Sequence, residues 1–185
     1  MRQMFYSFVR VFLSFVLVFS LGACSASRSA GLEPFQSTDG RYGFLYPTGW
    51  IRVSVNNGPA VAFHDLINSD ETLSLVVSKL NNEVDLESLG GASVVGERFI
   101  NQLVSQNEGG PKVELLQTNE REYSGHIFYD LEYTINYPDK QRHELATVVL
   151  DKDNLYTFSA GTSDNRWPKV DSLFERVITS FTFLS

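Results

Sequence analysis

The second half of the chain contains four strand-like runs that follow one another with very short connections. We predict these strands over Val113–Tyr123, His126–Tyr137, Arg142–Leu150 and Leu155–Gly161. Short connections can join only antiparallel neighbours, because a parallel pair needs a crossover of about a dozen or more residues. An antiparallel meander is therefore expected at the centre of the fold.

Two segments instead have the apolar periodicity of an amphipathic helix. The first spans Ser93–Gln106 and lies between glycine-rich breakers, and the second follows Pro168. Proline suits the first turn of a helix, where its missing N–H leaves no bond unmade. The two predicted buried faces are Val95, Phe99, Ile100, Leu103 and Val104, and Val170, Leu173, Phe174, Val177 and Ile178.

The first half adds further strand-like runs. Tyr42–Tyr46 and Trp50–Ser54 flank Pro47-Thr48-Gly49, which predicts a tight hairpin, and Val61–His64 and Leu73–Ser78 follow. Strands combined with two amphipathic helices indicate the α+β class. The expected architecture is a central antiparallel β-sheet flanked by helices, an α/β/α sandwich.

The N-terminus has the layout of a secretory signal: two arginines, a short apolar run and then small residues. The run from Val11 to Leu21 is too short to span a bilayer, which takes roughly 20 residues. Leu21-Gly22-Ala23-Cys24 resembles a bacterial lipobox, in which the cysteine thiol accepts a diacylglycerol. We therefore expect a signal peptide over 1–23, a lipidated Cys24 with a flexible tether over 24–36, and a folded domain over 37–185. Cleavage after Ala26 without lipidation is the alternative.

Charge and motifs exclude several functions. The net charge of −7 argues against nucleic-acid binding, which needs a basic face. A single cysteine allows no intrachain disulfide and no four-cysteine zinc site. The sequence contains no nucleophile elbow, dinucleotide-binding turn or Walker loop. We expect a protein that is not an enzyme and requires no cofactor, with no catalytic residues to assign.

The chain has three histidines, His64, His126 and His143, and the last has a candidate partner. If Asp151–Asn154 forms the turn, His143 lies opposite Thr162, and Asp164 is two residues beyond that partner. An imidazole and a carboxylate together form a weak zinc or manganese site, with water completing the shell. The alternative is a His–Asp hydrogen bond that fixes the connection from strand to helix.

The two tryptophans invite a similar choice. Trp50 alternates with apolar residues at a strand start, which favours burial. Trp167 precedes the final helix and is expected to pack beneath it. Arg166 and Trp167 could instead form an interaction surface, because both residue types are enriched at binding hot spots.

Several motifs together resemble the PsbP family of photosystem II extrinsic proteins. They are Tyr42-Gly-Phe-Leu-Tyr-Pro-Thr-Gly-Trp50, Arg142-His-Glu-Leu-Ala146, Leu155-Tyr-Thr-Phe158, Asp164-Asn-Arg-Trp167 and Ser180-Phe181, in the family's order. The resemblance runs from about Phe35 to the C-terminus. It implies an antiparallel sheet between helices and a lipid-anchored protein on the lumenal side of a cyanobacterial thylakoid membrane. The implied partners are photosystem II lumenal subunits or assembly intermediates.

The resemblance also bears on metals. In plant members a histidine and an aspartate are linked to zinc or manganese, and their positions match His143 and Asp164. Plant members carry a longer N-terminal segment that helps retain calcium and chloride at the oxygen-evolving complex. Here we expect a lipidated cysteine and a short tether in its place, so the ion-retention role is not carried over. The leading expectation is a non-enzymatic accessory protein for photosystem II assembly, repair or stability. The alternatives are a zinc or manganese carrier of the lumen and, more weakly, a small-molecule binder with a pocket between sheet and helix.

Overall fold

The computed structural model describes residues 31–80, 86–105 and 110–184. The predicted signal peptide and Cys24 lie outside the described residues. One compact unit begins at Gly31 and contains two antiparallel sheets.

The large sheet has seven strands in the order β3-β4-β5-β9-β8-β7-β6. Their bounds are β3 Ile51–Val53, β4 Val61–His64, β5 Thr72–Lys79, β6 Lys112–Tyr123, β7 His126–Asn136, β8 Gln141–Asp151 and β9 Asn154–Ser163. The predicted meander is confirmed as β6 to β9, each strand pairing antiparallel with the next. Ser124 and Gly125 both have positive φ, 50° and 74°, which gives their two-residue turn the twist that a hairpin needs.

The small sheet was not expected. It joins β1 (Leu32–Gln36), β2 (Tyr42–Pro47) and β10 (Thr182–Phe183), with β2 in the centre. The predicted tether over 24–36 is therefore wrong from Leu32 onward, and the folded unit starts before residue 37. Leu32 is buried and the Phe35 ring stacks on Phe44 at 4.6 Å, so this segment has apolar side chains to bury after all.

The predicted hairpin around Pro47-Thr48-Gly49 is also wrong. The turn forms, with Trp50 N–H donating to the Pro47 carbonyl at 3.2 Å, but its two strands enter different sheets. Both edges of β2 are occupied by β1 and β10, so β3 pairs with β4 instead. The turn thereby carries Trp50 into the core, where it is 7% exposed and meets Phe174 edge-on.

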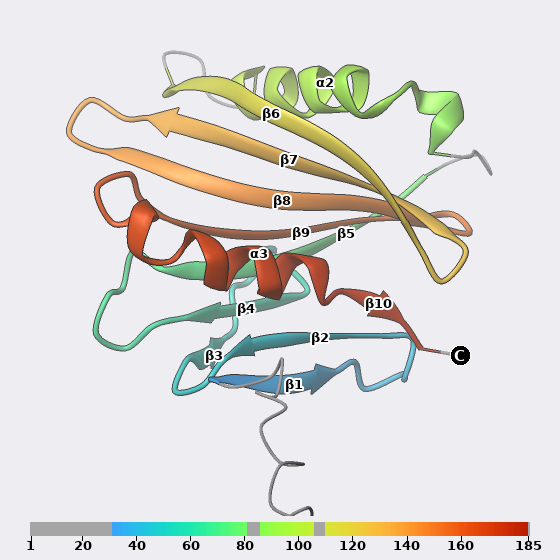
Figure 1. Cartoon of the computed structure of the whole chain (residues 1–185), viewed down its shortest axis with the longest axis horizontal. Helices are drawn as coiled ribbons and strands as arrows, with labels where there is room; N and C mark the ends of the chain where they lie inside the picture. Colours follow the sequence, from blue (N-terminus) through green and yellow to red (C-terminus); the bar gives the residue numbers. More distant parts are fainter. Residues whose placement is uncertain (1–30, 81–85, 106–109, 185) are drawn as a thin grey trace, which may run out of the picture. The chain divides into compact units, whose positions relative to one another are not determined.

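Both predicted helices form, and they lie on opposite faces of the large sheet (Figure 1). Helix α2 (Ala92–Ser105) covers one face after the short 3₁₀ helix η1 (Glu87–Leu89). Helix α3 (Asp171–Thr179) follows the 3₁₀ helix η2 (Trp167–Lys169) and shares the other face with the small sheet. The α+β class with a central sheet between helices is confirmed. One residue of the predicted buried faces is not buried, because Val104 of α2 is 44% exposed.

Each face of the large sheet has its own apolar core. The core under α2 is the smaller one and includes Val95, Ile100, Leu131 and Val148. The other joins α3, the small sheet and the large sheet around aromatic rings that are at most 3% exposed. These rings are Phe44, Phe128, Tyr156, Phe158, Phe174 and Phe181.

Candidate interaction site at one end of the large sheet

His143 lies near the start of β8, where strand register sets its neighbours. It pairs with Thr162 of β9, as the turn arithmetic predicted, and with Thr134 of β7. Its residue surface is 7% exposed, so the imidazole is largely removed from water. A buried ring with two polar nitrogens needs partners for both.

Both nitrogens of His143 face carboxylates. Nδ1 lies 3.2 Å from Asp164 Oδ1, and Nε2 lies 2.8 Å from Glu132 Oε1. An ionised carboxylate only accepts hydrogen bonds, so each contact is a hydrogen bond when the facing nitrogen carries a proton. The predicted His143–Asp164 pair is therefore present and fixes the segment that follows β9. Glu132 was not predicted.

The His143 ring is also covered by Trp167. The two rings are parallel, with centroids 3.9 Å apart and planes inclined by 7°. Trp167 meets Phe174 of α3 at 6.0 Å, which confirms its predicted packing against the final helix. It nevertheless remains half-buried rather than fully enclosed. Its indole thus closes the histidine site while presenting part of its surface to solvent.

Arg166 is anchored next to this stack. Its Nε donates to Glu71 Oε1, and the Glu71 side chain is only 5% exposed. The Arg166 side chain is 34% exposed, so part of the guanidinium is accessible. Glu71 precedes β5 in the sequence, so this ion pair ties η2 to a distant segment of the chain.

A second ion pair supports the same end of the sheet from the opposite face. Arg142 Nε donates to Glu144 Oε1 at 2.8 Å, and the two side chains are 12% and 10% exposed. Arg142 also donates to the Asp70 carbonyl and the Thr72 hydroxyl, next to Glu71. Burial raises the pKa of Glu144, while Arg142 acts in the opposite direction.

The Glu144 carboxylate fits against the neighbouring strand because the residue that pairs with Glu144 in β9 is Gly161. A Cβ at Gly161 would lie 1.9–2.2 Å from the carboxylate atoms of Glu144. No side chain other than hydrogen is compatible with that position of the carboxylate. The glycine therefore allows a buried charge to be placed against the sheet.

The residues fit a closed metal centre poorly. Glu132 and Asp164 contact opposite nitrogens of His143, so the two carboxylates do not converge on one point. In the part of the chain that the structure describes, no group of three or more His, Cys, Asp or Glu side chains is placed to hold a metal ion. His143 and Asp164 offer two ligands, and solvent would have to supply the others. The predicted zinc or manganese site stays a prediction.

The other two histidines lie elsewhere. His64 Nδ1 contacts the Asp65 carbonyl at 2.9 Å. His126 Nε2 lies 3.5 Å from Asp151 Oδ1, and its ring packs on Phe183 at 4.5 Å. Within the described part of the chain, neither histidine shares a hydrogen bond, ion pair or ring contact with His143. The candidate site therefore consists of Glu132, His143, Asp164, Arg166 and Trp167, which we call the His143 site.

A model of the PsbP family matches residues 30–183, and the chain belongs to that family. It is 38% identical to the protein named CyanoP from Synechocystis sp. over 92% of this chain and 93% of that protein. The CyanoP of Thermosynechococcus vestitus is 33% identical over 90% and 93% of the two chains. The solution structure of the Synechocystis protein, titled cyanobacterial PsbP (CyanoP), superposes with a TM-score of 0.72 and covers 88% of this chain and 98% of that one.

These comparisons confirm the family resemblance inferred from the motifs. Among the described residues, no helix combines the length and the apolar character needed to cross a bilayer.

Proposed function

We propose that this chain is a non-enzymatic accessory protein of photosystem II that assists the assembly, repair or stability of the complex. It acts on the lumenal side of the thylakoid membrane, held there by lipid on Cys24. The observation that carries the proposal is the match to the PsbP family across the folded unit, together with 33% and 38% sequence identity to two cyanobacterial CyanoP proteins over at least 90% of the chain. The lipobox-like Leu21-Gly22-Ala23-Cys24 supports the anchor.

We infer that the His143 site is the docking surface. Trp and Arg are enriched among residues that dominate binding energy, and here Trp167 and Arg166 are each partly exposed. Both are held in place, Trp167 by its stack on His143 and Arg166 by the buried Glu71. A side chain that is already fixed loses little conformational entropy on binding. The surface is therefore preorganised for a partner.

The same contacts favour docking over catalysis at this site. A general base needs a nitrogen or oxygen free to reach a substrate. In the His143 site both ring nitrogens are engaged by carboxylates, and the ring face is covered by Trp167. The imidazole is thus used to hold neighbouring side chains in position.

Co-purification tests the docking proposal. Thylakoids that carry wild-type chain or the Trp167→Ala variant are solubilised in mild detergent, and tagged photosystem II is isolated with its assembly intermediates. Loss of a central aromatic typically costs about 2 kcal/mol or more of binding, or at least about thirtyfold in affinity. We expect wild type to co-purify and Trp167→Ala to be depleted.

Tyr123→Ala provides the matched control. Tyr123 is an aromatic residue that is 54% exposed, and it lies at the opposite end of the large sheet from His143. This variant should co-purify like wild type. Absence of wild type from every complex refutes the photosystem proposal. Equal recovery of Trp167→Ala and wild type refutes the docking surface.

The anchor has a separate test. Cys24→Ser removes the thiol that would accept the lipid, so this variant should leave the membrane fraction, while wild type remains and carries the mass of a diacylglycerol. An unmodified wild-type N-terminus would overturn the anchor without affecting the docking surface.

A metal-carrier function is the second candidate, favoured by the 3.2 Å approach of His143 Nδ1 to the exposed carboxylate of Asp164. Titration calorimetry with zinc or manganese compares wild type, His143→Ala and the control His126→Ala. Binding that is lost only in His143→Ala supports the site. Identical isotherms for all three proteins eliminate it.

A further inference from the structure

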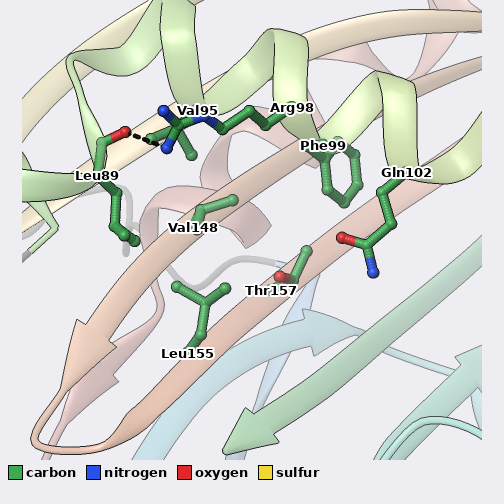
Figure 2. A pocket seen from close by; sticks show the side chains of 8 residues that line it. All are labelled: Leu89, Val95, Arg98, Phe99, Gln102, Val148, Leu155 and Thr157. Atoms are coloured by element: carbon green, nitrogen blue, oxygen red, sulfur yellow. Dashed lines mark hydrogen bonds between the residues drawn. The ribbon is translucent and has the colours of Figure 1, made fainter. Parts of the chain in front are cut away.

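A cavity of about 180 Å³ lies between α2 and the large sheet, and none of its lining residues belongs to the His143 site. Figure 2 shows the side chains that line it. Val95, Phe99 and Gln102 of α2 line one side. Val148, Leu155 and Thr157 of β8 and β9 line the other. The lining is mainly apolar, and polar groups from three residues lie among these side chains.

The cavity follows from where α2 rests. The helix packs chiefly on β6 and β7, with Phe99 edge-on to Tyr133 at 5.5 Å. The cavity instead lies over β8 and β9, where Thr157 contributes a short side chain. Its neighbour across the ladder, Val76 of β5, is 43% exposed. The helix therefore leaves apolar sheet surface uncovered beside it.

The volume is large enough for part of an organic molecule. A cavity of about 150 Å³ lined by Leu, Ile and Phe stays free of water and binds benzene. The cavity under α2 is of similar volume and is apolar around Val95, Val148 and Leu155, but it is partly open to solvent. A six-membered ring or a branched aliphatic group of that size would fill it.

One end of the cavity carries a positive charge. Arg98 Nη1 donates to the Leu89 carbonyl at 2.7 Å, which fixes the guanidinium beside η1, as Figure 2 shows. A guanidinium has five N–H donors, and its planar fork matches a carboxylate. The contact with Leu89 uses one of these donors. Gln102 and the Thr157 hydroxyl add neutral polar groups farther along.

We propose that this cavity is a binding site for a small monocarboxylate whose apolar part is about the size of a six-membered ring. The apolar part lies among Val95, Val148 and Leu155, and the carboxylate pairs with Arg98. The site is separate from the docking surface and does not depend on a photosystem partner.

Methyl NMR on the intact folded chain tests the proposal, with 3-phenylpropanoate as the probe and 3-phenylpropanamide as its neutral match. For a ligand of this size we expect a dissociation constant of roughly millimolar order. Saturable shifts should centre on the methyl groups of Val95, Val148 and Leu155. Absence of saturable shifts at these methyls overturns the proposal.

Variants separate the cavity from the charge. Thr157→Phe fills the space and should abolish binding, whereas Thr157→Val keeps the volume and should bind within about threefold of wild type. Arg98→Gln should weaken the carboxylate about tenfold or more and leave the amide unchanged, because it removes a charge-assisted hydrogen bond. Retained binding in Thr157→Phe refutes the location. Equal binding of acid and amide by wild type refutes the ligand class.

Discussion

Replacement of Gly161 by alanine probes the ion pair that supports the His143 site. The backbone at Gly161 lies outside the left-handed region, so alanine meets no strain there. Glycine to alanine within a regular element normally stabilises by about 0.5–1 kcal/mol. Here the new Cβ would lie 1.9–2.2 Å from the Glu144 carboxylate, far inside ordinary contact. We therefore expect the carboxylate to be displaced and Gly161→Ala to destabilise the fold.

The size of the effect follows from what the displaced carboxylate leaves behind. Glu144 would lose its 2.8 Å hydrogen bond to Arg142, whose side chain is 12% exposed. Leaving a buried polar partner unsatisfied costs about 1–3 kcal/mol, and Arg142 keeps its bonds to Asp70 and Thr72. After the backbone gain of about 0.5–1 kcal/mol is subtracted from this cost, the free energy of unfolding should fall by about 1 kcal/mol, and by no more than about 2.5 kcal/mol.

Urea denaturation followed by circular dichroism measures this change, and a double-mutant cycle assigns it. In a Glu144→Ala background the carboxylate is absent, so Gly161→Ala should then be neutral or stabilise by about 0.5–1 kcal/mol. The reasoning fails if Gly161→Ala is as stable as wild type. It also fails if the substitution has the same effect in both backgrounds.

Three further predictions concern the core and two carboxyl groups. Phe174→Ala removes a ring that is 0% exposed and contacts Trp50 and Trp167. Urea denaturation should show that the free energy of unfolding falls by about 3–5 kcal/mol. A fall below about 1 kcal/mol would contradict this packing. Burial raises the pKa of Glu144 above 4.5, so the folded state holds this proton more tightly than the unfolded state. Wild type should therefore lose stability relative to Glu144→Gln as pH rises above about 4.5, and pH-dependent denaturation that shows the opposite slope would refute the assignment. The Ser37 hydroxyl, and after it Arg41, lowers the pKa of Asp39 from 3.8 to about 2. Ser37→Ala should therefore raise the pKa of Asp39 in an NMR titration. A pKa still near 2 in this variant would exclude Ser37 as the main cause.

The central meander could be predicted because short turns between consecutive strands determine how those strands pair. Ser124-Gly125 and Asp151–Asn154 fix both the direction and the register of the strands that they join. The same register placed His143 opposite Thr162 and brought Asp164 within reach. Glu132 could have been found in this way, because the short turn before β8 pairs His143 with Thr134, two residues beyond Glu132.

The small sheet was not predictable by these means. Its central strand β2 pairs with β10, whose residues follow about 140 positions later in the sequence. No turn connects β2 and β10, and a strand of two residues is too short to show an alternating apolar pattern. Tyr42–Tyr46 and Trp50–Ser54 therefore looked like the two arms of a hairpin, since the competing partner for β2 was not visible locally.

Arg166 and Trp167 were recognised as residue types suited to binding, but their supports were not. Glu71 lies 95 positions before Arg166 and meets it only because β5 and β9 are neighbours. The parallel stack of Trp167 on His143 likewise depends on how η2 turns after β9. Contacts of this kind are set by tertiary packing, which composition and spacing do not encode.

In the small sheet, β10 (Thr182–Phe183) pairs with β2 (Tyr42–Pro47), so the sheet is complete only when these late residues are present. Helix α3 and β10 come from the final fifteen positions, yet Phe181 lies fully buried between rings from β2 and β9. A nascent chain that has not yet received these residues leaves Phe44 and Phe158 without their cover. Completion of this core therefore waits until α3 and β10 have been synthesised, and a polypeptide cut short before them would expose an aromatic surface that promotes aggregation.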